Sequence, residues 1–338
     1  MGDRVRMQDV ARLAGVSIAT VSAVINDSVK VSDLRRKRVL SAMEALDYHP
    51  DQIARSLRVG KTCAVGVIVP DLTNTFYPEV VRGVEEAAHT AGYAVLLCDS
   101  NEDAEEEQRH LGTLFSRRVD GVLLACCANS LAHDTMVRRR FPIVWVDSIP
   151  RGATERTVCT DNVQAGYLAT RHLIELGHER IALLAGNVGF SSHFDRLAGF
   201  RQAMRESQLP VREEYLATDG VQIESGYRAT KQLAGLQLPP TAIVATNNKL
   251  ALGMLKALNE LEIPCPENIS TVGIDSILWA EAFRPKLTTV EQSDYELGKR
   301  ALEMLMQVIA LEPQAVLPVR NVRLEPTLRV RDSTARPR

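Results

Sequence analysis

From residue 63 onward, short apolar runs alternate with stretches whose apolar residues recur at helical spacing. Strand-like runs lie at 64–70, 93–99, 120–126 and 142–147, and again at 180–186, 241–247 and 270–275. The helical stretches lie at 78–91, 104–117, 129–139, 163–176, 195–207, 225–235 and 248–261. Strands that alternate with helices form parallel sheets covered on both faces. Two such series of similar size predict an α/β core of two doubly wound parallel-sheet lobes.

The first 50 residues have a different pattern, typical of an all-α unit. Short helices are expected at 8–14, 18–25 and 33–47. Gly15 suits a tight turn after the first helix, and Ser17 and Ser32 suit the N-caps of the second and third. A helix, a turn containing glycine and a second helix form a helix-turn-helix, although a generic three-helix bundle has the same pattern. The short second helix, capped by an exposed serine that can also meet a phosphate, favours the helix-turn-helix.

Residues 51–62 separate the two regions. Pro50 ends the all-α unit, and the basic amphipathic stretch 51–59 is too short to be stable as an isolated helix. It is expected to be a hinge helix and linker that folds when a partner holds it. Residues 1–62 hold eleven Lys and Arg against seven Asp and Glu, whereas the rest of the chain has an excess of acidic residues. A basic head on an acidic body suggests that only the head meets a polyanion.

Composition also argues against several kinds of protein. The N-terminus lacks an apolar stretch behind basic residues, which predicts no secretory signal, and no run reaches the length of a membrane span. A cytoplasmic protein without membrane contact is therefore expected. The six cysteines form no CxxC pair, and no other metal motif is present. The sequence predicts neither a metal site nor a cofactor.

Several stretches carry a family likeness. The segments MQDVARLAGVSIATVSAVIN (7–26), VS (31–32), ALDYHP (45–50) and ARSL (54–57) closely resemble the LacI/GalR repressors. The likeness continues through PDLTNTFY (70–77), RRVDGVLL (117–124), TDNVQAGYLATRHLIELGHERIALLAG (160–186), RLAGFRQAM (196–204) and NNKLALGMLKAL (247–258). The chain is therefore similar to this family over almost its whole length.

The resemblance implies a transcriptional repressor that binds a pseudo-palindromic operator as a homodimer. Its DNA-binding domain is expected at 1–50, and its effector-binding and dimerisation core, similar to periplasmic sugar-binding proteins, at 63–338. The expected lobes are 63–161 plus 293–321 and 162–292 plus 322–338, with crossovers near 161–164, 290–293 and 320–324. The effector is expected to be a sugar, a sugar acid or a nucleoside, acting as inducer or co-repressor. The tail 329–338 has no heptads, which favours a dimer over a tetramer.

In this family, the start of the second helix lies in the major groove of DNA. The base-facing positions carried over to this sequence are Ile18, Ala19 and Ala23. The positions that hold phosphates are Ser17, Thr20, Ser22 and Asn26. Ala23 replaces a longer polar or basic side chain of many relatives, so direct readout is expected to be thin. DNA shape is then expected to carry more of the specificity.

The resemblance also assigns DNA contacts outside that helix. Arg6 replaces a threonine that often caps the first helix, a loss of about 1 kcal/mol that pairing with a phosphate can offset. In the hinge, Leu57 is expected to wedge between central base pairs from the minor groove, flanked by Arg55 and Arg58. Without the resemblance, Leu57 is better interpreted as a core residue of a short amphipathic helix.

Polar and aromatic residues that follow the strands are the expected effector contacts. The signature pair of the family maps to Arg196 and Asp275, a guanidinium and a carboxylate that suit a polyhydroxylated or anionic ligand. The other expected lining residues are Asp71, Asn74, Phe76, Asp147, Phe190, His193 and Asn247. Trp145 and Trp279 are further candidates, for which packing in the core or at a dimer interface is the competing interpretation. Asn248 replaces a more usual aspartate, so that corner of the pocket is expected to differ.

Two other classes of protein compete with a regulator. A transport receptor needs a signal sequence and no basic head, and the sequence shows the opposite in both respects. An enzyme needs a nucleophile with its base, or a metal centre. Ser192, His193 and Asp195 have the residue types of a catalytic triad, but adjacency in sequence is not triad geometry. The sequence therefore predicts a regulator without enzymatic activity.

Overall fold

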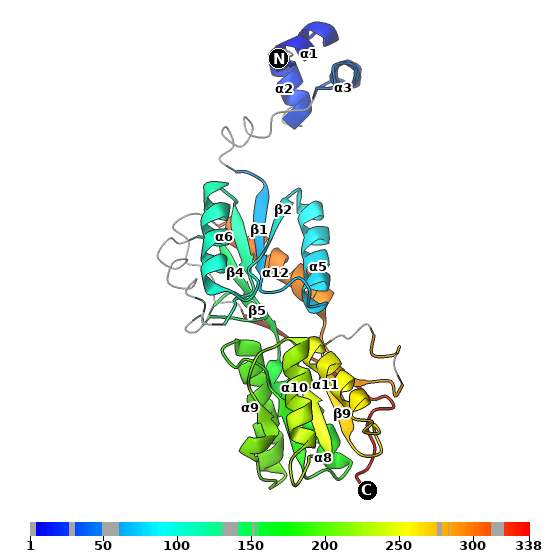
Figure 1. Ribbon diagram of the computed structural model, residues 1–338. Helices are drawn as coiled ribbons and strands as arrows, with labels where there is room; N and C mark the ends of the chain where they lie inside the picture. Colours follow the sequence, from blue (N-terminus) through cyan, green and yellow to red (C-terminus); the bar gives the residue numbers. More distant parts are fainter. Residues whose placement is uncertain are drawn as a thin grey trace. The chain divides into compact units, whose positions relative to one another are not determined.

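The computed structural model describes residues 5–26, 31–48, 61–128, 130, 141–150, 153, 155–275, 279–282, 284–311 and 321–338. The chain divides into two units, Met1–Thr62 and Cys63–Arg338. Figure 1 shows helices alone in the first unit, and strands flanked by helices in the two lobes of the second. Most of the expected hinge, including Arg55, Leu57 and Arg58, lies outside the described residues.

The first unit is all-α, as predicted. Its helices are α1 (Met7–Ala14), α2 (Ile18–Asn26) and α3 (Asp33–Ala45). Gly15 ends α1 with a φ of 63°, a left-handed conformation that glycine adopts without strain, and α1 and α2 bend by 104° at this turn. Such an angle is typical of a helix-turn-helix. The three helices share a small buried core, formed by Val10, Ala11, Ala14, Val21, Val24, Val39 and Ala42.

The caps of these helices agree with the sequence at Ser17 and differ at Ser32. Ser17 Oγ accepts a hydrogen bond from the backbone N–H of Thr20 at 3.2 Å. Ser32 makes no side-chain cap hydrogen bond, so this prediction is wrong; residues 32–35 are exposed, and water can satisfy the N–H groups of such a helix start. At α1, the Asp9 carboxylate accepts a hydrogen bond from the backbone N–H of Arg6 at 2.9 Å. Asp9 thus replaces part of the cap that Arg6 cannot supply.

The first lobe of the core is a six-stranded parallel sheet in the order β11-β5-β4-β3-β1-β2. Its strands are β1 (Ala64–Val69), β2 (Ala94–Asp99), β3 (Gly121–Leu124), β4 (Ile143–Val146), β5 (Thr157–Thr160) and β11 (Asn321–Leu324). Along β1, Val65 and Val67 pack under α5 (Phe76–Ala91) and α12 (Asp294–Ile309). Ile68 packs on the other face under α6 (Ala104–Ser116). Because helices cover both faces, apolar residues run continuously along the strand.

The second lobe repeats this plan in the order β12-β10-β9-β8-β6-β7. Its strands are β6 (Ile181–Leu184), β7 (Leu216–Ala217), β8 (Ala242–Ala245), β9 (Ser270–Ile274), β10 (Thr288–Glu291) and β12 (Thr327–Arg329). One face packs against α8 (Asn162–Glu175) and α9 (Ser191–Glu206). The other packs against α10 (Ile223–Ala234) and α11 (Asn248–Glu260), and a short 3-10 helix, η1 (Glu213–Tyr215), precedes β7.

Glycines let three helix pairs approach closely. A Cβ atom on Gly199 of α9 would lie 1.9 Å from the carbonyl oxygen of Val163, and one on Gly166 of α8 would lie 2.0 Å from that of Arg196. The pairs α5–α12 and α10–α11 have the same arrangement, through Gly83, Gly298, Gly226 and Gly253. No side chain fits at these positions. The contact at Gly166 sets the distance between the start of the second lobe and the helix that carries Arg196.

The chain passes between the lobes three times. It crosses at Asp161 after β5, at 292–293 after β10 and at 325–326 between β11 and β12. The first two positions lie within or beside the expected intervals. The third was expected near 320–324, with the lobe boundary after residue 321, and this expectation is wrong because 321–324 pair with β5 as a parallel strand of the first sheet. The first lobe therefore continues to Leu324.

One strand departs from the predicted parallel order. β12 runs antiparallel to β10 at the edge of the second sheet. The physical reason is the crossover itself, since the chain enters the second lobe from the side where the other strands end. A strand that starts there must run in the opposite direction. A parallel strand would need a long return connection, and only residues 325 and 326 lie between β11 and β12.

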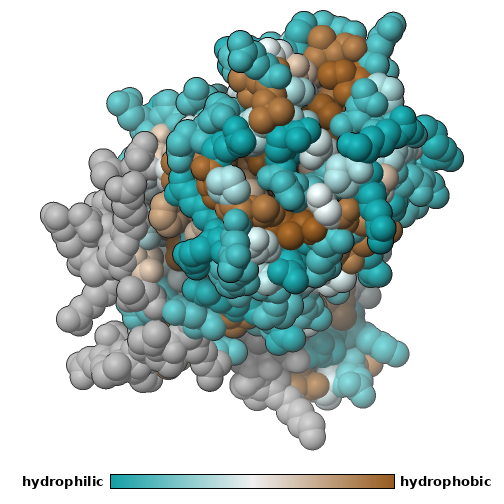
Figure 2. Space-filling model, turned by 90° about the horizontal axis from the view of Figure 1, so that it is seen from below, coloured by the Kyte–Doolittle hydropathy of each residue, from teal (hydrophilic) through white to brown (hydrophobic). Residues whose placement is uncertain are grey.

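The face in Figure 2 is mainly hydrophilic, with hydrophobic residues in separate patches. Within the described ranges, no single helix is long and apolar enough to cross a membrane, and only the bent pair α1 and α2 together reaches the necessary length and composition. The large apolar side chains lie instead in clusters on both faces of each sheet.

Candidate functional site

A cavity lies between the two lobes of the core, at the carboxyl ends of strands from both sheets. Its volume is about 40 Å³, well below the range of about 300–1000 Å³ of small-molecule sites, so the lobes must move apart before a ligand of that size can enter. The first lobe contributes Pro70, Asp71, Asn74, Phe76, Tyr77, Glu102 and Asp147. The second lobe and the crossover after β10 contribute Phe190, Ser192, His193, Arg196, Val221, Asn247, Lys249, Asp275 and Gln292. Asp71 follows β1, Asp147 follows β4 and Asp275 follows β9, which is where sheets of this kind place ligands.

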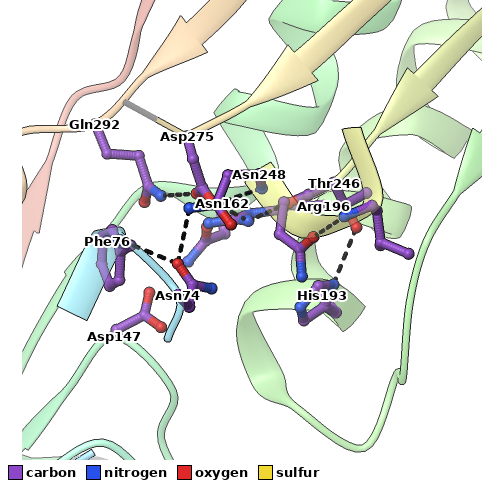
Figure 3. Close-up of polar contacts among 12 residues, drawn as sticks. Asn74, Phe76, Asp147, Asn162, His193, Arg196, Thr246, Asn248, Asp275 and Gln292 are labelled. Carbon is purple, nitrogen blue, oxygen red and sulfur yellow. Dashed lines mark hydrogen bonds and ion pairs between the residues drawn. The ribbon is translucent and has the colours of Figure 1, made fainter. Parts of the chain in front are cut away.

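Arg196 of α9 is buried and held from several sides (Figure 3). Its Nε donates to Asn162 Oδ1 at 2.8 Å, and its Nη1 donates to the carbonyl oxygen of Thr246 and lies 3.5 Å from Asp275 Oδ1. Asn162 is the first residue of α8, directly after the crossover at Asp161. The crossover and the close α8–α9 pair thus fix the guanidinium before any ligand arrives.

Asp275 is the buried partner of Arg196 and is fully engaged. Its Oδ2 accepts from the backbone N–H of Asn248 at 3.0 Å, and its Oδ1 accepts from Gln292 Nε2 at 2.5 Å. Burial raises the pKa of Asp275, and Arg196 and the two donors oppose this shift. A φ of 124° turns the residue at the end of β9 toward the cavity. A buried ion pair needs such extra donors because the loss of water is otherwise unfavourable.

Asp147 is the matching carboxylate of the first lobe, and it is only half engaged. The Tyr77 hydroxyl donates to its Oδ2 at 3.1 Å, whereas Oδ1 is buried and has no hydrogen-bond partner among the described residues. Burial raises the pKa of Asp147 to about 6, and the positive charge of Arg196 opposes the shift. A buried acceptor left unpaired is unfavourable by about 1–3 kcal/mol, so this oxygen favours a ligand that donates to it.

His193 presents a second acceptor from the opposite lobe. Its Nδ1 lies 2.8 Å from the carbonyl oxygen of Ala185 and 3.0 Å from Thr246 Oγ1. A carbonyl oxygen only accepts, so Nδ1 carries the hydrogen. Burial, reinforced by the charge of Arg196, lowers the pKa of His193 to about 3. The ring is therefore neutral, and its Nε2 is left with a lone pair on the edge away from Ala185.

Two phenylalanines supply apolar walls. Phe76, at the start of α5, packs edge to face against Tyr77 with ring centroids 5.0 Å apart. Phe190, just before α9, packs edge to face against His193 at 5.9 Å. Both rings are buried and line the cavity. A flat or ring-shaped ligand would meet apolar surface on its faces and polar groups around its edge.

The structure brings all nine of the sequence-predicted effector residues to this one cavity. Trp145 and Trp279 do not line it. Trp145 is 1% exposed and belongs to the core under α6, and Trp279 packs against the core under α10 and α11, as their competing interpretation had it. Sequence reasoning missed Pro70, Tyr77, Glu102, Ser192, Val221, Lys249 and Gln292. A signal existed for Lys249, because it follows the polar pair Asn247 and Asn248 after a buried strand.

The predicted DNA contacts of the head lie mostly at and near the start of α2, with Arg6 before α1 and Asn26 at the other end of α2. Ser17, Ile18 and Ala19 are exposed at the start of the helix, with Ile18 45% exposed, and Arg6 is exposed before α1. Thr20, Ser22 and Ala23 are half-buried beside them. Asn26 is the last residue of α2. Val21 and Val24 face the core of the head, so α2 offers its first turn to a partner.

Comparisons with known proteins agree with the fold and the site. Residues 62–325 match the model of the periplasmic binding proteins and sugar binding domain of the LacI family. Residues 6–51 match that of the bacterial regulatory proteins of the lacI family.

The ribose operon repressor of Escherichia coli (strain K12) is 36% identical, over 97% of this chain and 99% of that protein. The HTH-type transcriptional repressor PurR of Vibrio parahaemolyticus is 35% identical, over 90% of this chain and 91% of that protein. The crystal structure of the Lac repressor dimer bound to operator and the anti-inducer ONPF superposes with a TM-score of 0.87 at 27% identity, covering 98% of this chain and 100% of that chain. The chain therefore belongs to the LacI family of bacterial regulatory proteins, which are DNA-binding transcriptional regulators and not enzymes.

Proposed function

We propose that the protein is a homodimeric repressor of transcription whose effector is a neutral, polyhydroxylated sugar of one ring. The observation that carries the choice of effector is Asp147 Oδ1, a buried acceptor without a partner among the described residues, together with the neutral His193 ring, which lines the cavity and whose Nε2 is proposed as a second acceptor. They belong to opposite lobes, so one ligand with several hydroxyl groups can donate to both. A ligand that bridges the lobes in this way favours their closed arrangement.

The charges of the cavity favour a neutral ligand over an anionic one. Four carboxylates line it, from Asp71, Glu102, Asp147 and Asp275, against the two cations Arg196 and Lys249. Both cations are already paired, Arg196 with Asp275 and Lys249 with Asp71. An added carboxylate or phosphate would find no free cation among these lining residues and would be repelled by Asp147. A sugar acid is therefore disfavoured.

A purine base is the second candidate. The cavity is flanked by Phe76 and Phe190, whose rings also suit a flat heterocycle, and the N–H groups of a purine can donate to the same acceptors. A ribose operon repressor and a PurR repressor are similarly close to this chain, at 36% and 35% identity, so the identities do not choose between the two candidates. The density of acceptors around the edge favours the sugar, which has more donors for its size.

The head is proposed to read DNA through the first turn of α2. Ile18, Ala19 and Ala23 would meet base edges, mainly thymine methyl groups, and Ser17, Thr20, Ser22 and Asn26 would hold phosphates. Arg6 would add a phosphate contact. In the hinge, Leu57 would enter the minor groove between Arg55 and Arg58. Two heads on a two-fold dimer match a pseudo-palindromic operator, and a regulator of chromosomal DNA works in the cytoplasm.

Effector and operator would be coupled through the lobes. Closure of the lobes on the ligand changes the separation of the two hinges in the dimer, and that separation decides whether both hinges can fold on one operator. The coupling is reciprocal, so the operator must alter effector affinity by the same factor. Whether the ligand releases or recruits DNA is decided by which lobe arrangement the operator favours.

The test is isothermal titration of the full-length protein against aldopentoses, aldohexoses, their aldonic acids and purine bases. Asp147→Asn and Arg196→Met are titrated beside wild type, with Lys231→Met as a control because Lys231 pairs with Glu260 within the second lobe, outside the cavity. A neutral sugar that binds wild type and Lys231→Met, and binds both cavity variants more weakly, supports the proposal. Tight binding of an aldonic acid contradicts the charge argument, and tight binding of a purine base selects the second candidate.

A parallel experiment tests the DNA-binding part. Duplexes selected from a random pool by wild type are expected to be two half-sites related by a pseudo-two-fold axis. On the selected duplex, Leu57→Ala should weaken binding strongly, whereas Leu34→Ala should not, because Leu34 is a 69% exposed residue of α3 with no proposed DNA contact. Equal affinities of the two variants would contradict the proposed role of Leu57.

A further inference from the structure

Two neighbouring residues at the start of α11 join the lobes directly. Lys249 Nζ, on the second lobe, donates to the carboxylate of Asp71 and to Thr73 Oγ1 at 2.6 Å, both in the loop after β1 of the first lobe. The same Nζ donates to Gln222 Oε1 at 2.8 Å, and Gln222 Nε2 donates to Glu102 Oε1, on the first lobe, at 2.8 Å. A lysine from one lobe thus lies among two carboxylates and a hydroxyl from the other.

The preceding residue, Asn248, makes a second connection. Its Nδ2 donates to Asn74 Oδ1 and to Thr75 Oγ1, each at 2.8 Å. Asn74 Oδ1 also accepts from the backbone N–H of Phe76 at 3.0 Å, so this oxygen is fixed as an acceptor. A donor is therefore required at position 248. The aspartate that is more usual there would bring a carboxylate against an acceptor and repel it.

The bonds of Asn248 and the ion pair between Lys249 and Asp71 are partly buried, whereas the bonds of Lys249 to Thr73 and Gln222 are exposed. The side chains of Lys249 and Asp71 are only 11% and 13% exposed, and lysine is seldom so buried without a partner. Burial raises the pKa of Asp71, but hydrogen bonds from Lys249 and Thr73 outweigh it and lower the pKa. Burial and the charge of Asp71 raise the pKa of Glu102. Without Lys249, the carboxylates of Asp71 and Glu102, which both accept from Gln222 Nε2, would repel each other with no cation between them.

We infer that Asn248 and Lys249 of α11, together with Asn74 and Asp71 of the first lobe, form a clasp that holds the lobes closed when no effector is bound. Asn248 and Lys249 are adjacent in the chain, and Asp71 and Asn74 lie in the same loop after β1. One small opening movement therefore breaks both contacts. Effector exchange would then require the clasp to open. This inference concerns the ligand-free protein and does not depend on which ligand the cavity takes.

The clasp has a direct consequence for the set point of the regulator. A ligand that enters only the open form binds with an apparent affinity reduced by the fraction of open molecules. A stronger clasp therefore gives weaker apparent binding, and it slows release of a ligand once the lobes have closed around it. Asp71, Asn74 and Lys249 also line the cavity, whereas Asp147 and His193 take no part in the clasp, so variants at Asp147 change ligand contacts without changing the clasp.

The test is hydrogen–deuterium exchange of the ligand-free, full-length protein, followed by mass spectrometry. The variants are Lys249→Met and Asn248→Asp, with Lys231→Met as the matched control because its 2.8 Å ion pair with Glu260 joins α10 and α11 within one lobe. Segments 71–77 and 246–252 are expected to exchange about tenfold faster in the two clasp variants and at the wild-type rate in the control. The α12 segment 297–305 should not change.

The exchange Asp71→Lys with Lys249→Asp restores the ion pair in reverse and should recover slower exchange than Lys249→Met alone. Equal exchange in wild type and both clasp variants would overturn the inference, as would acceleration of the same size in Lys231→Met. Acceleration that includes 297–305 would show general unfolding. In that case the reversed pair decides, because a clasp predicts its recovery and a merely structural lysine does not. An unchanged exchange pattern together with sugar binding would remove the clasp and leave the proposed function intact.

Discussion

Asp147 and Asp275 occupy corresponding places in the two lobes, yet they are held very differently. Both are buried, both follow a strand of the parallel sheet, both have a positive φ, of 57° and 124°, and both have a raised pKa. Asp275 accepts from Asn248 and Gln292 and faces Arg196. Asp147 accepts from Tyr77 alone and keeps one buried oxygen without a partner in the described part of the chain.

The two carboxylates therefore differ in how much they gain from a ligand. On the second lobe, both charges of the Arg196–Asp275 pair already have partners before a ligand arrives. On the first lobe, the unpaired oxygen of Asp147 gains a partner only when a ligand hydroxyl donates to it. We therefore expect changes at Asp275 and Arg196 to reduce stability as well as binding, and changes at Asp147 to weaken binding without a loss of stability.

The largest expected effect comes from removing the ion pair between Arg196 and Asp275. Arg196→Met leaves Asp275 as a buried charge without its cation and should destabilise the core by about 3–5 kcal/mol. Urea unfolding followed by tryptophan fluorescence measures this, since Trp145 lies in the first lobe and Trp279 in the second. Asp147→Asn, tested beside it, should leave the urea midpoint at or above that of wild type. A similar loss of stability in both variants would contradict the proposed difference between Asp275 and Asp147.

A second comparison uses helix pairs of the two lobes. A Cβ on Gly166 would lie 2.0 Å from the carbonyl oxygen of Arg196, and one on Gly298 would lie 1.9 Å from that of Val80. Gly166→Ala and Gly298→Ala should each destabilise the protein by about 1–3 kcal/mol, because helix backbones must move apart. Only Gly166→Ala displaces Arg196, so only it should also weaken binding of the sugar identified by titration. Equal losses of affinity would mean that the position of α9 does not set the site.

The third prediction concerns the unpaired oxygen of Asp147. Asp147→Asn replaces one acceptor oxygen by a donor and should weaken sugar binding by about 1–3 kcal/mol, roughly fivefold to 150-fold. Titration calorimetry of the folded variant measures the change, and Tyr77→Phe serves as a milder companion because it removes only the hydroxyl at 3.1 Å. Unchanged affinity in Asp147→Asn would show that the free oxygen is not a ligand contact.

The smallest expected effect is a dependence on pH. A ligand hydroxyl donates to the ionised form of Asp147, whose pKa in the free site is raised to about 6. Sugar affinity should therefore fall by up to about tenfold per unit as the pH drops below 6. His193, with a pKa of about 3, stays neutral throughout. The pKa values of Asp275 and Glu102 are also raised, so a fall that persists in Asp147→Asn would assign the effect to them.

The same carboxylate links pH to stability in the opposite direction. Because its folded pKa lies above the unfolded value, ionising Asp147 opposes folding, and this contribution develops as the pH rises from about 4 to 6. Stability measured without ligand should decline over that range in wild type by more than in Asp147→Asn. Parallel curves for the two proteins would contradict the raised pKa.

Much of the site could be predicted because parallel strands end together. Asp71, Asp147, Asn247 and Asp275 each follow a buried apolar run, and the carboxyl ends of such strands converge at one edge. The family likeness added Arg196, which lies inside a helix and has no strand-end signal. The alternation of runs also gave most strands and helices of both lobes to within a few residues.

Other parts could not be read because they depend on contacts between distant segments. Lys249 acquires its role only from Asp71, 178 positions away in the chain. Gln292 belongs to a crossover whose path is set by both lobes. Tyr77 is indistinguishable in sequence from a core residue of α5, and its hydroxyl matters only because Asp147 lies 3.1 Å away. The strands β5, β10, β11 and β12 are short and partly polar, and β7 has only two residues, so all five lack the apolar runs that marked the others.

The three crossovers also constrain how the chain can be made. The first sheet is complete only when β11, at Asn321–Leu324, has joined β5, and α12 must pack on α5 from more than 200 positions away. On the ribosome, the amino-terminal lobe therefore waits, with its apolar face uncovered, until nearly the whole polypeptide has emerged. The last strands of the two lobes, β11 and β12, follow each other closely near the end of the chain, so neither lobe is complete until then. Synthesis consequently leaves a long interval in which the nascent chain is exposed to aggregation and depends on whatever protects it.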